Sequence, residues 1–533
     1  MAGMTAASPP PLVAPIVLLL LHLVTSIMAR NCVPGPVSLP IVNVTLATGK
    51  TRRGIAVNVG QPGQQFAFLP RWGNNNTFLY GPECDSLGLV DTNDACITFR
   101  GGLYDPAKGG PAPLGNNLVE PWNSKTYSMF TDTLDLGNNI SLADFPIASP
   151  VNVTDWNLQG YDPQNMIGLG SASSLIQALR KKRQIASSAV GFYWGLDGVN
   201  DRDQRPGAFV LGGYDKAKTY GPGHTAFLSD TKDCESGMMV SLRDIVLNFA
   251  NGTDASIFSR ENGGTLLRAC LIPERPVVMD MPLKPYFANL LDKIGNVEAG
   301  RSNSVDWWNV ILDGTLPIFS GSLSFVLESG LQIKIPNHQL IVPERRIEAG
   351  GGISVNDSRP ALRINSLQST TSQSLPLLGR YFFTGAYVMA NRDANQFTLW
   401  EANPTSEENL VAVNDKNEVF PATAKGSCAR QPTASLKPDG ANSGGSGASV
   451  SPGAMAGIAV GGAAAIVAAA ALTWWLLRRK REAKATQPEP TFESGRDKPL
   501  QSPKQDPHHP LPHLIPHELS SGATQRQPAE MLA

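Results

Sequence analysis

The stretch VNVGQPGQQFAFLPRWG, residues Val57–Gly73, decides the fold because it opens one of two copies of a repeated plan. Its apolar and alternating residues, bounded by Gly and Pro, predict a strand that leads to Arg71. The apolar, apolar, Gly triplet Met166–Gly168 comes later in the same half. In the second half an apolar strand leads to Asp280, and the triplet Leu377–Gly379 follows at nearly the same interval. The repeat predicts two lobes of one plan.

The residues around this repeat continue the same pattern. From about residue 40 to 403, short apolar or alternating runs are broken by Gly, Pro and Asn, which is typical of a mostly β protein. Helical patterns are few, and the clearest are Ser173–Arg183 and Tyr286–Ile294. We therefore predict a mostly β, bilobal ectodomain with lobes at residues 40–235 and 236–405.

The N-terminus carries an export signal. An apolar run from Leu12 to Ala29 is followed by Arg30 and then Cys32, which predicts a signal peptide at residues 1–29. The region before the apolar run has no Lys or Arg, so an uncleaved anchor stays open as an alternative.

A second apolar segment lies near the C-terminus. Residues 455–477 are uncharged, and about 23 residues at a rise of about 1.5 Å each cross a hydrocarbon layer of about 30 Å. The basic run Arg478–Arg481 follows at once, and positive charge marks the cytoplasmic side. We expect a type I single-pass protein at the plasma membrane or cell surface, with an extracellular ectodomain, a stalk at 406–453 and a disordered tail at 478–533. An Ala-rich core helix is the alternative.

The cysteines and glycosylation sequons agree with export. Six cysteines suit an oxidising compartment. Cys84 and Cys96 close a short loop and are the favoured disulfide. The pairing of the others stays open; they are Cys32, Cys234, Cys270 and Cys428. The predicted glycosylation sites are Asn43, Asn75, Asn139, Asn152, Asn251 and Asn356.

Four segments, in order, resemble the pepsin family of aspartic proteases, as a degenerate, membrane-anchored, fungal-type member. They are VNVGQPGQQFAFLPRWGNNNTFLYG (57–81), MIGLGSASSLIQAL (166–179), GAFVLGGYDKAKTYG (207–221) and LPLLGRYFFTGAYVMANRDANQFTLWEAN (375–403). The resemblance covers roughly 350 residues and implies a bilobal, pepsin-like β fold with a deep cleft between the lobes.

The resemblance also implies a damaged catalytic site. In that family two aspartates, one per lobe, share a proton and activate a water. The first Asp-Thr-Gly-Ser falls on Arg71–Asn74, and the second falls on Asp280–Leu283. Arg71 stays protonated and cannot act as a base, so Asp280 alone is an insufficient catalytic residue. We expect Arg71 and Asp280 to form an ion pair. A misplaced alignment, or a merely solvated Asp280, is the alternative.

Other chemistries have too few residues in the predicted ectodomain. His224 and His338 stand alone in their segments, so neither a metal site nor a Ser-His-Asp triad is predicted, and no cofactor is expected. A formal net charge of -1 gives no field that would draw nucleic acid. The partners of the cytoplasmic tail are unknown.

Three functions follow from these residues. The first is a pseudo-protease that binds a peptide, glycan or protein ligand in the cleft between the lobes. The second is an active aspartic-type endopeptidase that uses Asp280 in a non-standard site. The third is a structural cell-wall or stalk protein without a ligand.

Overall fold

The computed structural model describes residues 33–84, 89–113, 127–150, 163–258, 266–367, 374–421 and 427–428. All of these ranges belong to one compact unit, Met1–Ser435. The predicted signal peptide, membrane segment 455–477 and tail lie outside the described residues, as does most of the predicted stalk. Within the described ranges, no helix is both long and apolar enough to cross a membrane.

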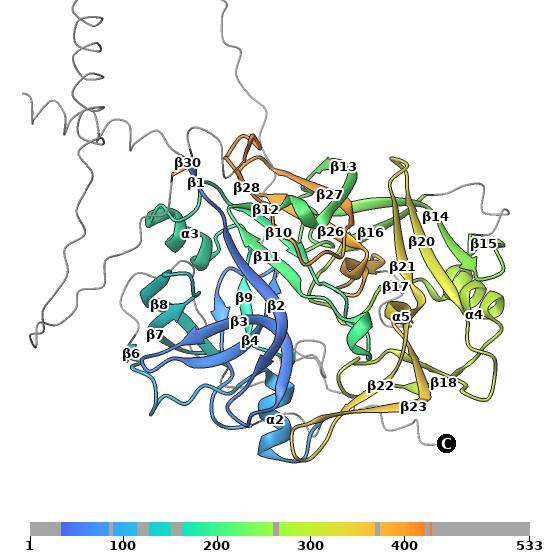
Figure 1. The fold of residues 1–533 in the computed structure, drawn as a ribbon, viewed down its shortest axis with the longest axis horizontal. Helices are drawn as coiled ribbons and strands as arrows, with labels where there is room; N and C mark the ends of the chain where they lie inside the picture. The colour runs from blue at the N-terminus through green and yellow to red at the C-terminus, as the bar shows by residue number, and fades with distance from the viewer. Residues whose placement is uncertain are drawn as a thin grey trace, which may run out of the picture. The chain divides into compact units, whose positions relative to one another are not determined.

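The largest sheet in the described ranges has 16 strands and contains most strands of the first half of the chain (Figure 1). Its main path runs β13-β27-β26-β10-β11-β2-β3-β4-β9-β5-β8-β7-β6, and β12, β28 and β29 join at its side. Its strands are β2 (Val37–Thr45), β3 (Thr51–Val59), β4 (Gln64–Arg71), β5 (Thr77–Phe78), β6 (Ala112–Pro113), β7 (Tyr127–Asp135), β8 (Ser141–Pro150), β9 (Met166–Gly168), β10 (Ala189–Tyr193), β11 (Gly207–Leu211), β12 (Gly213–Asp215), β13 (Thr219–Phe227), β26 (Ala386–Asn391), β27 (Gln396–Ala402), β28 (Leu410–Val413) and β29 (Val419–Pro421). Because β26 and β27 come from the second half of the chain, this sheet joins both halves.

The remaining strands form three smaller sheets. An eight-stranded sheet contains β14 (Met239–Phe249), β15 (Asp254–Ser256), β16 (Leu267–Leu271), β17 (Met279–Met281), β20 (Gly321–Leu327), β21 (Gln332–Pro336), β24 (Ile364–Ser366) and β25 (Leu377–Leu378). A four-stranded sheet contains β18 (Glu298–Arg301), β19 (Val310–Leu312), β22 (Ile341–Ile347) and β23 (Ile353–Leu362). The third pairs β1 (Val33–Pro34) with β30 (Ser427–Cys428).

The helices are short and lie between strands. The α-helices are α2 (Asn93–Arg100), α3 (Ser174–Lys181), α4 (Ala288–Ile294) and α5 (Asn337–Leu340), and the other helical turns are η2 (Asp201–Asp203), η3 (Lys216–Lys218), η5 (Leu283–Phe287) and η7 (Phe382–Thr384). The helices predicted at 173–183 and 286–294 are confirmed as α3 and α4. The Ser173 hydroxyl caps α3 by accepting a hydrogen bond from the Ile176 N–H.

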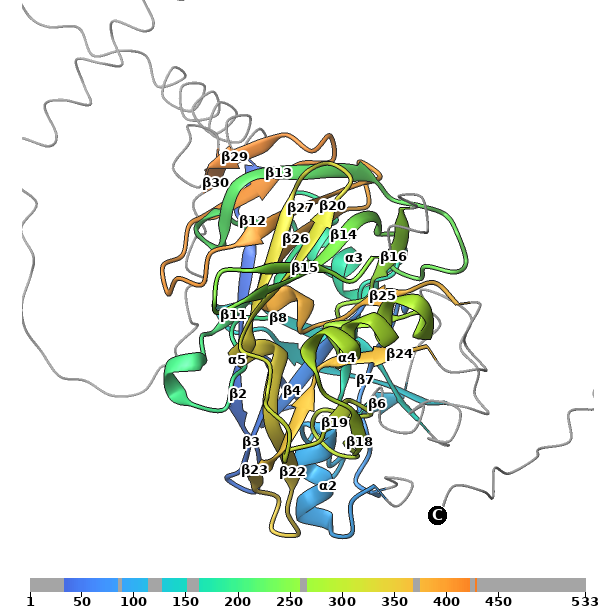
Figure 2. The same cartoon turned by 90° about the vertical axis from the view of Figure 1, so that its right-hand side faces the viewer.

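Helix α2 was not predicted, although its two ends carry ordinary sequence signals. The Thr92 hydroxyl accepts from the Ala95 N–H at the start, and Gly101 adopts the left-handed conformation at the end. The Thr98 hydroxyl donates to the Gly351 carbonyl at 2.7 Å, in the turn between β22 and β23. Both views show α2 beside the β22–β23 hairpin (Figures 1 and 2). This contact therefore ties the first half of the chain to the second.

Two three-strand units repeat the same pairing, although they match different strands from those that the sequence repeat matched. In the first half, β9 pairs in parallel with β4 and antiparallel with β5. In the second half, β25 pairs in parallel with β16 and antiparallel with β17. By this pairing β16 corresponds to β4, and β17 corresponds to β5. One continuous cluster of buried apolar side chains runs through both halves, from Val37 to Leu399.

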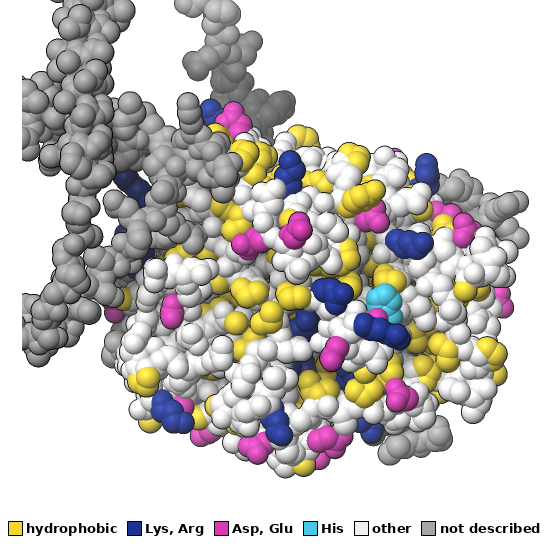
Figure 3. All heavy atoms as spheres, in the orientation of Figure 1, with side chains coloured by type: hydrophobic (Ala, Val, Ile, Leu, Met, Phe, Trp, Pro, Cys, Tyr) yellow, Lys and Arg dark blue, Asp and Glu magenta, His cyan; other side chains and the backbone are white. Residues whose placement is uncertain are grey.

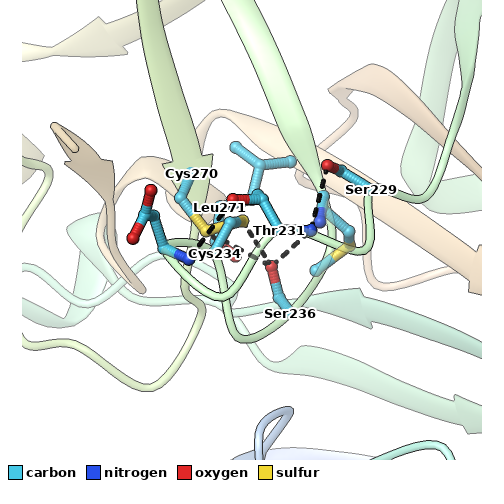
Figure 4. Close-up of a disulfide and its surroundings, with 8 residues drawn as sticks. Ser229, Thr231, Cys234, Ser236, Cys270 and Leu271 are labelled. Carbon is cyan, nitrogen blue, oxygen red and sulfur yellow. Dashed lines mark hydrogen bonds between the residues drawn. A yellow bond between two sulfur atoms is a disulfide. The ribbon is translucent and has the colours of Figure 1, made fainter. Parts of the chain in front are cut away.

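Two disulfides are present in the described ranges. The predicted Cys84–Cys96 bond is confirmed, and it ties the loop before α2 to that helix. The second bond, between Cys234 and Cys270, was left open by the sequence. It joins the segment before β14 to β16, and the Ser236 hydroxyl lies beside both sulfur atoms (Figure 4).

We expect a third disulfide between Cys32 and Cys428. Strand β1 pairs in parallel with β30, so that Val33 lies opposite Ser427 and Pro34 lies opposite Cys428. Cys32 itself lies outside the described residues, but the other four cysteines are already paired with one another. Peptide mapping without reduction should recover one peptide that joins Cys32 to Cys428. The Cys32→Ser variant should expose one thiol that reacts with maleimide, and a Cys32–Cys234 or Cys32–Cys270 peptide would contradict the assignment.

Candidate functional site

Arg71 is the last residue of β4, and its side chain is directed at carboxylates. In the register of β4 and β9 it lies opposite Gly168. The Arg71 Nε atom lies 3.6 Å from Glu274 Oε1, and its Nη2 atom lies 3.6 Å from Glu235 Oε2. The side chains of Arg71 and Glu274 are 11% and 2% exposed, so this ion pair is largely shielded from water. Glu235 is the exposed member, at 52%.

A glycine makes room for Glu235 beside Arg71. A Cβ atom at Gly73 would lie 2.6 Å from Glu235 Oε2, which is closer than real Cβ atoms approach. Neither Glu235 nor Glu274 was a candidate from the sequence. The signal for Glu274 is weak, since it is a charged residue three positions after the end of the strand β16.

The position related to Arg71 in the second half follows from strand register. Cys270 lies opposite Leu377 and Leu271 opposite Leu378, in parallel, just as β4 meets β9. One further step in this register places Ile272 opposite Gly379, and the Ile272 N–H donates to the Leu378 carbonyl at 2.8 Å. Ile272 is therefore the counterpart of Arg71.

This register corrects the sequence alignment, which matched Asp280 to Arg71. Asp280 is the central residue of β17, opposite Leu377 in β25 and Asn365 in β24, and β17 corresponds to β5 rather than to β4. The alignment compared the intervals to the two apolar, apolar, Gly triplets. The hydrogen bonds between strands decide which residues lie opposite one another, and this register does not depend on the length of the connecting loop.

The expected ion pair between Arg71 and Asp280 is absent as well. Within the described ranges the structure gives no hydrogen bond or ion pair between them. Burial of the carboxylate raises the pKa of Asp280 to about 6, although Arg275, Asn365 and Arg301 lower it. The Asp280 Oδ1 atom is buried and has no hydrogen-bond partner in the described part of the chain. Asp280 is thus a poorly stabilised carboxylate, and it lies on β17 rather than on the strand that corresponds to β4.

The arrangement offers limited chemistry at the two related positions. Arg71 supplies a guanidinium and Ile272 supplies a hydrocarbon side chain, so neither position supplies a group that can both accept and return a proton. Glu274, two residues after Ile272, brings a carboxylate to Arg71 as an ion-pair partner. That contact joins the two repeated units.

The other predicted residues have these positions. Asn75 is half-buried, and its Oδ1 atom accepts from the Ala172 N–H at 2.8 Å. Among the other sequons, Asn43, Asn139 and Asn251 are exposed, Asn356 is half-buried, and Asn152 lies outside the described residues. His224 is half-buried and His338 is exposed. No group of three His, Cys, Asp or Glu in the described part of the chain could hold a metal ion.

The fold and the site define a mostly β protein in which two related units present a cation and an alkyl group. No family model and no curated protein matches the chain. Among solved structures, it is similar to the crystal structure of an aspartic proteinase from Irpex lacteus. The identity is 14%, the TM-score is 0.43, and the match covers 70% of this chain and 100% of that chain. We draw no activity or substrate from this similarity.

Proposed function

We propose that the protein is a catalytically impaired, pepsin-like glycoprotein of the cell surface that binds a peptide or protein ligand between its lobes. The observation that carries the proposal is the strand register that relates Arg71 to Ile272. Proton sharing between two carboxyl groups cannot take place at these positions. The ordered segments that resemble the pepsin family support the binding role, because the resemblance implies a cleft.

The Arg71–Glu274 contact supports impairment more strongly than the loss of one acid alone. A water held between two acids needs an open polar position with a base next to it. Here the largely buried guanidinium of Arg71 and the carboxylate of Glu274 take up that space and neutralise one another. The cell-surface location rests on the sequence, through the apolar segment 455–477 and the basic residues that follow it.

The purified full-length protein in detergent should show no pepstatin-sensitive cleavage of a mixed peptide library from about pH 3 to 6. We expect turnover at least about 10⁴-fold below that of an active aspartic protease run in parallel, since both acid positions are lost. The Asp280→Asn variant should behave like the parent protein. Mass spectrometry of the library is the measurement.

The same experiment separates the alternatives. An active endopeptidase would cleave peptides in a reaction that pepstatin blocks and that Asp280→Asn abolishes. The control variant Asp292→Asn, on the exposed face of α4, would leave that cleavage unchanged. Retention of particular peptides without cleavage supports the binding function. If the protein retains none of these peptides, the result supports the third function, a structural cell-wall or stalk protein without a ligand.

A further inference from the structure

A pocket of about 200 Å³ is lined by neither Arg71 nor Glu274, and four arginines contribute to its wall. Arg52 and Arg53 come from β3, Arg345 comes from β22, and Arg380 follows β25. The aromatic side chains that line it include Trp194. On the face shown in Figure 3, Lys and Arg side chains gather near the middle, in the region where Figure 1 draws α5. The pocket thus collects cations from segments that are far apart in sequence.

Positive charge exceeds negative charge around this pocket. Five guanidinium groups line it or adjoin it, against two carboxylates; they are Arg52, Arg53, Arg345, Arg363 and Arg380, with Asp197 and Asp306. Among the described residues that line the pocket, Asp197 is the one acidic residue. A ligand in this pocket would therefore meet an uncompensated positive field.

Both carboxylates are already bound. Asp306 accepts two hydrogen bonds from Arg345, at 2.8 and 2.7 Å, and a further one from Arg363 at 3.3 Å. Asp197 accepts from Arg345 Nη1 at 2.8 Å and from Trp194 Nε1 at 3.1 Å. These contacts neutralise Arg345 and Arg363, and the described ranges give no ion pair to Arg52, Arg53 or Arg380. Arg53 donates from Nη2 to the carbonyls of Trp194 and Arg205, both at 2.8 Å.

Arg52 and Arg380 are buried cations that still have free donors. They are 4% and 2% exposed, respectively. The Arg52 Nε atom donates to Gln164 Oε1 at 3.0 Å, and in the described ranges no acceptor is given for its terminal nitrogens. Arg380 has no side-chain acceptor in those ranges, its Nε atom is buried, and its guanidinium lies 5.4 Å from the Trp194 ring centroid. An anion would supply the missing acceptors.

Charge repulsion points to the same ligand. Burial, together with the positive charge of Arg380, lowers the pKa of Arg52 to about 10. Two buried like charges repel one another, so binding of an anion relieves an unfavourable interaction as well as forming hydrogen bonds. A volume of about 200 Å³ suits a small group rather than an extended chain.

We propose that this pocket binds a tetrahedral oxyanion, a phosphate or sulfate group, held by the terminal N–H groups of Arg52 and Arg380 beside Trp194. Guanidinium forks match the oxygens of such groups in pairs, and four terminal nitrogens suit a dianion better than a single carboxylate. The proposal does not depend on the proposed peptide-binding function, because Arg71 and Glu274 do not line this pocket.

The test is calorimetric and thermal titration of the full-length protein in detergent with inorganic phosphate, sodium sulfate and phenyl phosphate, against chloride at equal ionic strength. We expect saturable binding of the oxyanions and a rise in Tm that chloride does not produce. Arg52→Gln and Arg380→Gln should each weaken binding at least about tenfold, since each removes charged hydrogen bonds. The exposed Arg243→Gln on β14 is the matched control and should bind like the parent.

The outcomes are distinct. Tighter binding of phenyl phosphate than of inorganic phosphate identifies a phosphate ester as the ligand, and equal binding identifies the free ion. Absence of any oxyanion effect beyond that of chloride, or full binding by the Arg52→Gln/Arg380→Gln double variant, overturns the proposal. Should the glutamine variants fail to fold, Arg380→Lys keeps the charge but loses the paired geometry, and it should weaken phosphate binding while the Arg243→Gln control does not.

Discussion

Replacing Asp306 by asparagine should lower the free energy of unfolding by about 3–5 kcal/mol. Asp306 is fully buried and binds the guanidinium groups of both Arg345 and Arg363. Asparagine keeps the shape of the side chain but removes the negative charge, so the buried Arg363 loses its ion-pair partner and Arg345 keeps only Asp197. Equilibrium urea unfolding of the two proteins at pH 7 measures the difference.

The effect should depend on pH in one direction. Burial alone would raise the pKa of Asp306, but Arg345 and Arg363 outweigh it and hold that pKa well below its usual range. A lowered pKa contributes stability above the unfolded value of about 3.9, and this contribution is lost as the pH falls through the folded value. The difference in the free energy of unfolding between the parent and Asp306→Asn should therefore persist from pH 5 to 8 and shrink below about pH 4.

A matched control is the exposed Asp292 on α4, where the same substitution should change stability by no more than about 0.5 kcal/mol. A loss below about 1 kcal/mol for Asp306→Asn would contradict the buried network of Asp306, Arg345 and Arg363.

Asp280→Asn should have the opposite sign and raise the free energy of unfolding at pH 7 by about 1–3 kcal/mol. Burial raises the pKa of Asp280 to about 6, so at pH 7 the folded protein holds a charge that its surroundings disfavour. Asparagine removes this charge at nearly constant shape. The measurement is again urea unfolding.

The pH dependence distinguishes this explanation from a general packing effect. A raised folded pKa contributes stability that is fully present below the unfolded value of about 3.9 and is lost as the pH rises through about 6. The gain in the free energy of unfolding from Asp280→Asn should thus be largest at pH 7 to 8 and vanish near pH 4. An Asp280→Asn protein less stable than the parent at pH 7 would instead point to an ion pair of Asp280, as the sequence alignment implied.

The fold was largely predictable from the sequence, because its signals are local. Apolar runs broken by Gly and Pro predict strands, and the residue patterns of α3 and α4 predict helices. The short loop between Cys84 and Cys96 identified one disulfide. The Cys234–Cys270 bond was left open, since it depends on where β14 and β16 meet.

The site was only half predictable. Arg71 ends the strand that the sequence predicted, and its replacement of an acid stays a prediction from the resemblance. Its partner was misplaced by one strand, since Asp280 stood at the expected interval while Ile272 lay in the paired register. Glu235 and Glu274 carried no sequence pattern, and they became candidates only because the fold directs their carboxylates at Arg71.

The sequence by itself determined that this is a mostly β chain with an internal repeat, and that the first half ends its key strand on a cation. Only the tertiary structure decided which residues meet: Ile272 at the position related to Arg71, Glu274 against its guanidinium, and Arg52 beside Arg380 in a shared pocket. The physical reason is that hydrogen bonds between strands and the packing of distant segments select partners across loops, and the intervals along the chain do not encode that choice.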